Sequence, residues 1–396
     1  MLPPMTTSPG DGVVRLGQGT GPLRGVRVVE IAGIGPGPHA CMILADLGAD
    51  VLRVERPGGQ LLSGGGTMVL NRGRPSVALD LKQPEAAATV LELVRSADVL
   101  VEGMRPGVTE RLGIGPEACH AVNPRLVYGR MTGWGQDGPL AQSAGHDLNY
   151  ISVAGALFGM GQTPERPQFP ANLVGDFGGG STYLVIGLLA ALLEARVSGQ
   201  GQVVDAAIVD GTAHLNAMTS AFLASGGYQE ERGANLLDGG VPFYDVYETS
   251  DGKHVSVGAL EPQFFATLVS LLGLEGVAPG QEDLDRYDEL RSLLTATFAE
   301  RTQAEWVALF EGTDACVAGV IPVSEAPEHP HLKARETFVE HEGMVQPQPA
   351  PRFSRTSATL GLPPSPAAGT HTREALSAWG IADVDGLLER GVAVQA

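Results

Sequence analysis

Lysine and cysteine are both scarce in this 396-residue chain. Only three lysines occur, so 23 of the 26 basic residues are arginines. An anion bound by this protein should therefore meet guanidinium groups more often than ammonium groups. The three cysteines lie far apart and form no CxxC pair or even-numbered disulfide framework. Because no charged and then apolar signal segment opens the sequence either, we expect a reducing, cytoplasmic location.

Positive charge is also in short supply overall. The 26 basic residues stand against 45 acidic ones, which gives a formal net charge of −19. Nucleic acid and anionic membrane surfaces both require a broad basic face, so we expect neither as a partner. The acidity is uneven, because residues 51–111 hold eight cations and seven acids, whereas residues 282–314 hold three cations and nine acids. The first of these regions could still bind a small anion.

Long apolar runs are missing as well. The strongly apolar segment 183–193 ends at Glu194 and is too short to span a bilayer. We expect it to belong to a buried helix.

Short apolar runs alternate with helical patterns through the first half of the chain, which predicts an α/β fold with a Rossmann-like, mostly parallel sheet. A strand over residues 26–31, a Gly/Pro turn at 33–38, a helix ending near Gly48 and a strand at 51–54 form the first unit. The later strands are predicted at 98–101, 125–131 and 202–208, and the later helices at 84–97 and 181–196.

The length exceeds that of a usual single domain, so we expect two. A hairpin pattern at 244–257 and an acidic helical stretch at 282–310 indicate that the second is a smaller α+β domain. The predicted divisions are a flexible tail at 1–21, a large α/β domain at 22–225, a linker at 226–239, the small domain at 240–340, and a return segment at 341–396 that packs on the large domain.

The turn at 33–38 partly matches a dinucleotide-binding fingerprint. Gly33 and Gly35 fit the first two glycines and Glu55 closes the second strand, but Pro38 occupies the place of the third glycine. Since that glycine permits close packing of helix and strand, nicotinamide binding is disfavoured. A tight turn, or one that lets another ligand approach the backbone, remains open.

Two further sequence patterns do not indicate a catalytic or metal site. Residues 176–178 spell Asp-Phe-Gly, but the other protein-kinase signatures are missing. His329, His331 and His341 could hold a metal, but histidines in a polar loop are more typical of solvated surface. We therefore expect no metal site.

The strongest catalytic candidates are His146 and Asp176. His146 lies in the Gly-bordered segment 145–150, and Asp176 follows thirty residues later, just before three glycines and a serine. Histidine supplies a base near neutral pH, aspartate supplies a carboxylate, and bordering glycines let a ligand approach. Spacing alone leaves open whether the two side chains meet, or whether each is only a turn or cap residue.

From about residue 22 to about residue 355, the chain resembles the family III CoA-transferase (CaiB/BaiF) superfamily, and within it the racemases. The segments that carry the resemblance are 22–30, 33–39, 47–55, 71–74, 105–108, 131–139, 145–150, 173–180, 201–205 and 258–264. Each is modest alone, and their number and order make the match specific.

The resemblance separates two chemistries. In the racemases of this family, the residues matching His146 and Asp176 exchange a proton, and the one matching Glu261 is hydrogen-bonded to the histidine. In the transferases, the aspartate is a nucleophile that carries CoA as a thioester, and another residue, commonly aromatic, replaces the histidine. The resemblance thus implies epimerisation of the 2-methyl centre of 2-methyl-branched acyl-CoA thioesters, as part of fatty acid metabolism. Transfer of CoA between carboxylic acids through a covalent Asp176 intermediate is the alternative.

The resemblance also implies partners and binding residues. Arg56 and Arg111 are the expected CoA contacts, Arg105 is a further one, and the cation-rich window near the second strand adds Arg74. CoA enters as part of the substrate and binds the large domain, and no cofactor is expected. The family fold implies an interlocked homodimer, in which Glu261 would face the partner subunit's His146.

Overall fold

The computed structural model describes residues 14–59 and 69–396. Contacts divide the chain into two compact units. Unit 1 comprises residues 1–154, 170–215 and 334–396, and unit 2 comprises residues 155–169 and 216–333. The predicted linker at 226–239 thus falls inside unit 2, together with a segment, 155–169, that we had assigned to the large domain. Residues 1–13 of the predicted tail lie outside the described residues.

The rest of that predicted tail, residues 14–21, is packed against unit 1. Val14 is buried, and the backbone N–H of Gly17 donates to both carboxylate oxygens of Asp50, at 2.8 and 3.0 Å. Residues 14–21 thus pack on unit 1, and a Cβ on Gly19 or Gly21 would lie within 2.5 Å of a backbone carbonyl oxygen, so their glycines allow close contact with neighbouring backbone.

Unit 1 is built on a seven-stranded sheet in the order β12-β3-β2-β1-β4-β5-β6. Six strands are parallel and β12 is antiparallel to β3, which confirms the predicted mostly parallel α/β sheet. The strands are β1 (Arg27–Ile31), β2 (Asp50–Glu55), β3 (Ser76–Leu79), β4 (Val99–Glu102), β5 (Val127–Thr132), β6 (Val203–Ala207) and β12 (Ala393–Val394).

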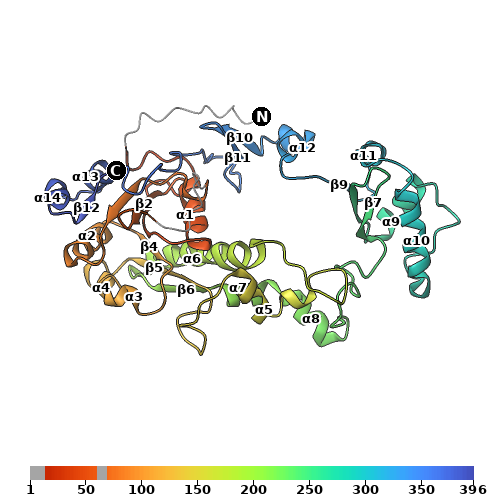
Figure 1. Cartoon of the computed structure of the whole chain (residues 1–396), viewed down its shortest axis with the longest axis horizontal. Coiled ribbons are helices and arrows are strands. Elements are labelled where there is room, and N and C mark those ends of the chain that lie inside the picture. The colour runs from red at the N-terminus through yellow and green to blue at the C-terminus, as the bar shows by residue number, and fades with distance from the viewer. Residues whose placement is uncertain (1–13, 60–68) are drawn as a thin grey trace. The chain divides into compact units, whose positions relative to one another are not determined.

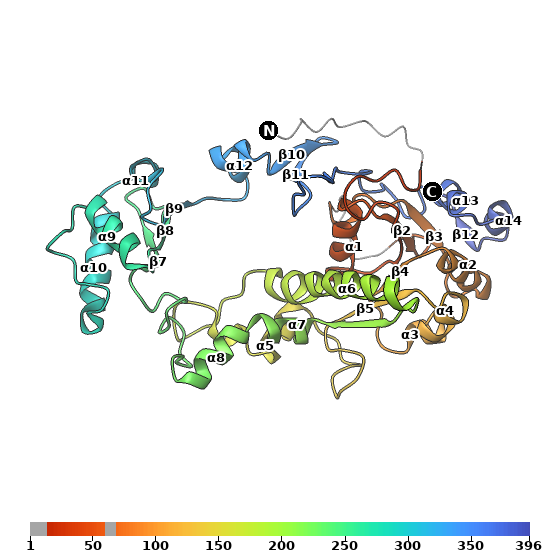
Figure 2. The same cartoon turned by 180° about the vertical axis from the view of Figure 1, so that it is seen from behind.

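Helices cover both faces of this sheet, because alternate strand residues are apolar on both sides. Val28 of β1 packs with α1 (Pro36–Asp46) and α6 (Tyr183–Ser198), whereas its neighbour Val29 packs with the helices on the opposite face. Those are α2 (Pro84–Arg95), α4 (Pro116–Val122), α13 (Thr372–Ala378) and α14 (Val384–Glu389). Figures 1 and 2 show α13 and α14 beside β12, far along the chain from the strands that they cover.

The remaining elements of unit 1 are short. They are a 3-10 helix η1 (Val69–Asn71), α3 (Val108–Arg111), α5 (Asp147–Val153), a π-helix η3 (Leu173–Thr182), α7 (Ile208–Leu215) and the hairpin β10 (Phe338–His341) with β11 (Met344–Pro347).

The apolar helix is longer than we predicted. η3 runs directly into α6, so residues Leu173–Ser198 form one helical segment with the length and composition of a possible membrane span. A core helix can share those two properties, and α6 packs its Leu184 and Leu188 into the core beneath β5. The expectation that this segment is too short to cross a bilayer is therefore wrong.

Unit 2 has an antiparallel sheet with the order β7-β8-β9. The predicted hairpin is confirmed as β7 (Tyr244–Glu248) and β8 (His254–Gly258), and β9 (Val317–Val320) pairs with β8. The acidic helical stretch is two helices, α10 (Tyr287–Phe298) and α11 (Gln303–Phe310). They are separate because Thr302 caps α11 with a side-chain oxygen that accepts from the N–H of Glu305.

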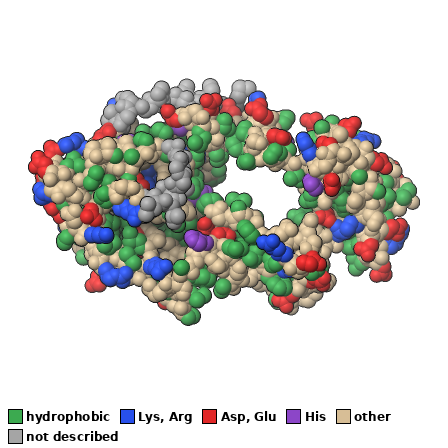
Figure 3. All heavy atoms as spheres, in the orientation of Figure 1, with side chains coloured by type: hydrophobic (Ala, Val, Ile, Leu, Met, Phe, Trp, Pro, Cys, Tyr) green, Lys and Arg blue, Asp and Glu red, His purple; other side chains and the backbone are tan. Residues whose placement is uncertain are grey.

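Aromatic rings hold the core of unit 2 together. Phe298 stacks on Tyr247 at 5.2 Å and meets Trp306 edge-on at 5.3 Å, and the Trp306 ring nitrogen donates to the Phe298 carbonyl. The other described helices of this unit of eight residues or more are α8 (Ala217–Ser225) and α9 (Pro262–Leu271). Acidic side chains are prominent over unit 2 on the face shown in Figure 3.

Candidate active site

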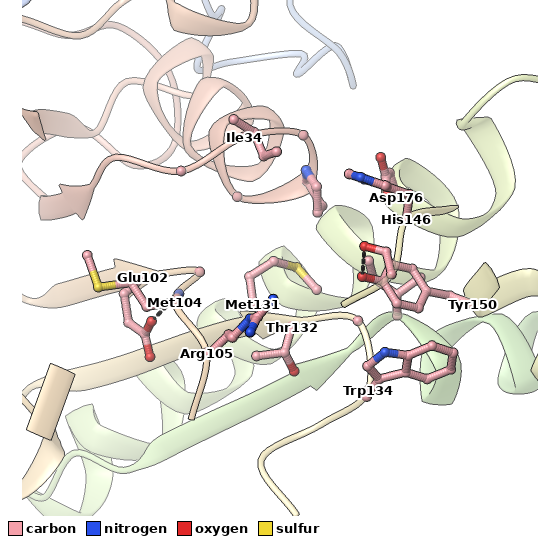
Figure 4. A pocket seen from close by; sticks show the side chains of 18 of the residues that line it. Ile34, Glu102, Met104, Arg105, Met131, Thr132, Trp134, His146, Tyr150 and Asp176 are labelled. Carbon is pink, nitrogen blue, oxygen red and sulfur yellow. Dashed lines mark hydrogen bonds between the residues drawn. The ribbon is translucent and has the colours of Figure 1, made fainter. Parts of the chain in front are cut away.

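A cavity of about 420 Å³ opens in unit 1 where β1, β4 and β5 end. The strand order reverses between β1 and β4, because the chain adds β2 and β3 on one side and then returns to the other. Loops leaving adjacent strands diverge at such a switch point, and open α/β sheets bind ligands there. The cavity is lined by the turn 33–38, the loop 103–106 after β4, and the loop after β5 that leads to His146. His146 and Asp176 both line it (Figure 4).

Buried ion pairs form the base of this edge of the sheet. Glu30 lines the cavity and binds two arginines, Arg53 and Arg74, which approach it from β2 and from the segment before β3. Glu102 at the end of β4 pairs with Arg130 at 3.0 Å. Because a buried charge without a partner is strongly destabilising, these pairs fix the strand ends that carry the loops.

Asp176 projects from the π-helix η3, a rare geometry that is frequent at functional sites. Glycine makes this path possible, since a Cβ on Gly179 would lie 2.5 Å from the Thr212 hydroxyl and a Cβ on Gly211 would lie 1.8 Å from the Gly179 carbonyl. η3 and α7 therefore pack backbone to backbone. The π-helix thus places the Asp176 side chain at the cavity.

His146 stands at the amino end of α5, with its backbone N–H donating to the Asn149 side chain at 3.0 Å. The next residue, Asp147, points the other way and is buried. Its carboxylate accepts from the backbone N–H of Asp176 at 2.7 Å. His146 thus presents an exposed imidazole, and the neighbouring Asp147 connects α5 to the segment that holds Asp176.

The environment of Asp176 disfavours its charge. Burial raises the pKa of Asp176 above its ordinary value, and the nearby Asp147 carboxylate acts in the same direction. A hydrogen bond from the Asn172 amide at 3.1 Å and the nearby His146 both act to lower that pKa, but burial dominates. A carboxyl group with a raised pKa can hold and release a proton nearer to neutral pH, as a general acid and base must.

A second histidine supports η3 from α1. The Nδ1 atom of His39 lies 2.6 Å from the Ser181 hydroxyl, which donates to the Phe177 carbonyl at 3.0 Å. A hydroxyl has one proton, so His39 is the donor of the first bond. The His39 ring also packs on the Phe177 ring at 4.4 Å. Burial, together with Arg72 and Arg74, lowers the pKa of His39, which favours the neutral ring.

The four arginines predicted to contact CoA lie in different environments. Arg105 lines the cavity directly after β4 (Figure 4). Arg56 is exposed just beyond the end of β2, and Arg111 is exposed on α3. Arg74 is buried, donating to Glu30 at 2.7 Å and to the Pro38 carbonyl at 3.0 Å. The prediction for Arg74 is corrected, because its guanidinium group is enclosed and bound to a carboxylate and cannot also reach a phosphate.

Glu261 belongs to unit 2, where it precedes the first residue of α9. His146 belongs to unit 1. The expectation that Glu261 faces the partner subunit's His146 stays a prediction. Within residues 14–59 and 69–396, no group of three or more His, Cys, Asp or Glu side chains is placed to hold a metal ion.

Sequence reasoning missed four residues that lie around Asp176 or support its segment. Asn172 precedes it by four residues, a spacing that places two side chains on one helical face and was the available signal. Asp147 was visible in the Gly-His-Asp triplet, but its inward orientation was not. His39 and Gly35 lie far from Asp176 in sequence, and a Cβ on Gly35 would lie 3.3 Å from the Asp176 carboxylate.

Comparisons with known proteins agree with this geometry. The family model described as CoA-transferase family III matches residues 23–372. The chain is 44% identical over 360 residues to the alpha-methylacyl-CoA racemase of Mus musculus, covering 90% of this chain and 93% of that protein. The Homo sapiens protein of the same name is 42% identical over the same shares. A CaiB/BaiF family protein from Brucella suis has a solved structure with a TM-score of 0.79 and 28% identity, covering 91% of this chain and all of that one.

Proposed function

This chain belongs to CoA-transferase family III, and from that premise we propose that it epimerises the 2-methyl centre of 2-methyl-branched acyl-CoA thioesters. The names of the mouse and human relatives support the assignment within the family. The structural observation that carries it is that an exposed imidazole, His146, and a half-buried carboxyl group, Asp176, line the same cavity. Inverting a carbon centre needs two such groups, one to remove a proton and one to return it.

The thioester makes the reaction possible. Its carbonyl delocalises the negative charge that forms when the α-proton leaves, so a side-chain base can remove that proton. In one direction neutral His146 takes the proton and protonated Asp176 donates one to the other face of the carbon. In the reverse direction the Asp176 carboxylate takes the proton and the His146 imidazolium donates. The raised pKa of Asp176 keeps its protonated form accessible.

The enolate oxygen needs hydrogen-bond donors. The backbone N–H of Asp176 cannot serve, because it donates to the Asp147 carboxylate. The N–H groups of Asp147 and Leu148 at the start of α5 are candidates, because they follow His146 directly and the first N–H groups of a helix have no acceptor within it, whereas the N–H of Asn149 already donates to the His146 carbonyl. We assign the thioester oxygen to them. The helix N-terminus also favours the developing negative charge.

The CoA moiety and the subunit arrangement complete the proposal. Arg105 lines the cavity, and Arg56 and Arg111 are exposed near the same edge of the sheet, where their guanidinium groups can bind phosphates. We propose a cytoplasmic homodimer that needs no cofactor, in which Glu261 orients and stabilises the charged form of the partner subunit's His146. A third group that orients a catalytic histidine is a recurrent arrangement.

One experiment tests the proposal directly. A single epimer of a 2-methylacyl-CoA is incubated with the protein in deuterated water, and both configuration and deuterium content are followed. Loss of optical purity together with α-deuterium incorporation is expected, and H146A and D176A should each reduce both by about 10²–10⁴-fold. Near-normal deuterium incorporation in H146A would contradict the assignment of His146.

CoA transfer is the second candidate, because other relatives carry transferase names. The succinyl-CoA–D-citramalate CoA-transferase of Chloroflexus aurantiacus is 31% identical over 399 residues, covering 94% of this chain and 96% of that protein. In this reaction Asp176 would attack the thioester and then carry CoA. Hydroxylamine trapping of a covalent Asp176 adduct, and CoA exchange with an added carboxylate without α-exchange, would support transfer over epimerisation.

A further inference from the structure

A second polar cavity of about 340 Å³ opens at the opposite edge of the same sheet. Its lining includes the residues just before β1, β4 and β5, and the carboxyl ends of α2 and α6. Four arginines line it, and Asp98 is the one acidic residue among the lining residues. The arginines are Arg24, Arg95, Arg125 and Arg196. The five residues of β1 separate the two edges by roughly 15–20 Å, so this cavity is distinct from the one that holds Asp176.

None of these four arginines forms an ion pair with an acidic side chain among the residues that the structure describes. Arg24 donates to the Gly17 carbonyl at 2.9 Å. Among the residues that the structure describes, the side chains of Arg95, Arg125 and Arg196 have no hydrogen bond or ion pair. In the same unit Arg53, Arg72 and Arg130 each bind a carboxylate. Four guanidinium groups without an acidic partner around one small cavity repel one another, and in a chain with net charge −19 such a cluster is a local exception.

Several hydrogen-bond acceptors at this cavity already have donors. The Asn123 amide group donates to the Val94 and Ala97 carbonyls, at 2.9 and 2.8 Å, which closes the end of α2. One oxygen of Asp98 accepts from the Arg27 backbone N–H at 2.8 Å. The same bonds hold the lining backbone in place. The groups in this cavity that can bind a ligand are therefore mainly guanidinium donors, carried by well-packed backbone.

Helix dipoles explain only part of the cluster. Arg95 and Arg196 lie in the last turns of α2 and α6, where a cation interacts favourably with the helix end. Arg24 and Arg125 precede strands and have no such role. The convergence of all four on one cavity needs a further reason.

We propose that this cavity binds a compact anion with at least two charged groups of the phosphate type, such as a diphosphate. Guanidinium groups bind phosphate oxygens through paired, charge-assisted hydrogen bonds, and two or more such groups can satisfy four arginines. The volume is large enough to admit a diphosphate. The site rests on its own residues, independently of the epimerisation proposed above.

Isothermal titration with inorganic pyrophosphate tests the site. The titration uses the intact protein saturated with CoA, so that the catalytic cavity is occupied, and sodium chloride holds the ionic strength constant. Saturable binding of one pyrophosphate per chain is expected, and its affinity should fall as the salt concentration rises. The double variant R125Q/R196Q should bind at least about tenfold more weakly.

A matched variant separates this site from general charge effects. R166Q/R335Q removes the same two charges from exposed positions that do not line the cavity, and it should bind pyrophosphate like the unchanged protein. The absence of saturable binding, or equal weakening in both double variants, would overturn the proposal. Because all four substituted arginines are exposed, far-ultraviolet circular dichroism should confirm that both variants remain folded. Racemase activity does not enter this readout, so a failed function assignment would leave the result interpretable.

Discussion

Asn172 tunes the acidity of Asp176 through a single hydrogen bond. Its amide donates to the Asp176 carboxylate at 3.1 Å, which favours the ionised form and lowers the pKa against the effect of burial. In N172A that bond is lost, so the pKa of Asp176 should rise further. The limb of the pH–rate profile that reports ionisation of Asp176 should move to higher pH. We would measure kcat/KM against pH for each epimer, and an unmoved limb would show that Asn172 acts only on structure.

The burial of Asp176 also affects the stability of the folded protein. Burial raises its folded-state pKa, so the folded protein binds this proton more readily than the unfolded chain. The ionised carboxylate therefore costs stability above the folded-state pKa. This cost declines as the pH falls below that value and is gone below the lower, unfolded-state pKa. D176N resembles the protonated form. It should lose about 10²–10⁴-fold in turnover, yet unfold at a higher temperature than the unchanged protein at neutral pH.

A pH series provides the control for D176N. Thermal unfolding of both proteins across a pH series should show the advantage of D176N shrinking in acid. An advantage that stays constant with pH would mean that repacking, and not the removal of a buried charge, is its cause.

At the scale of elements, the turn before α1 and the π-helix η3 must fit against each other. Gly35 has a φ of 67°, and a Cβ there would lie 3.3 Å from the Asp176 carboxylate. Its ψ is −116°, a combination that residues other than glycine rarely adopt, so G35A should cost at least about 1–2 kcal/mol of stability and, in addition, displace Asp176 and reduce turnover. G199A is the control for a positive φ alone, because Gly199 has a φ of 78° with no neighbour near its Cβ position. It should lose about 1–2 kcal/mol of stability and retain turnover, and equal losses of turnover would contradict a local effect.

His39 of α1 is hydrogen-bonded to Ser181 of η3. H39F keeps a ring to pack on Phe177 but loses the bond to Ser181, and S181A loses the same bond from the other side. S181A also loses the bond to the Phe177 carbonyl. Each variant should therefore reduce turnover several-fold, and the double variant should be little worse than S181A, because the His39–Ser181 bond is already absent there. Additive losses measured in this double-mutant cycle would show that His39 and Ser181 act separately.

At the scale of the whole molecule, the assembly of the site across subunits can be tested by complementation. In a closed dimer whose sites combine Glu261 with the partner subunit's His146, a heterodimer of H146A and E261A has one intact site. Random mixing of the two inactive variants should therefore restore about a quarter of the activity. If both residues acted within one subunit, every site would carry one defect. No recovery after unfolding and refolding the mixture would then be the result.

Much of the fold was predictable because it rests on local patterns. The apolar runs of β1 and β2, the proline-led starts of α1 and α2, and the β7–β8 hairpin all follow from short segments of sequence. The errors came where long-range packing decides. Residues 14–21 look like a loose tail by composition, but Asp50 and neighbouring backbone hold them, and η3 extends α6 only because α7 offers glycine-to-glycine contact.

The sequence by itself determined the chemistry that is available: a histidine, an aspartate, arginines in place of lysines, and glycines around them. It identified His146 and Asp176 because their residue types and Gly-bordered segments are local properties. Only the tertiary structure decided which charges are free to act. Arg74 is buried in an ion pair with Glu30, whereas Arg125 and Arg196 line an open cavity. The sequence around each of these arginines does not show this difference. Burial and pairing depend on residues distant in sequence that the sheet brings together, so they emerge only when the chain is folded.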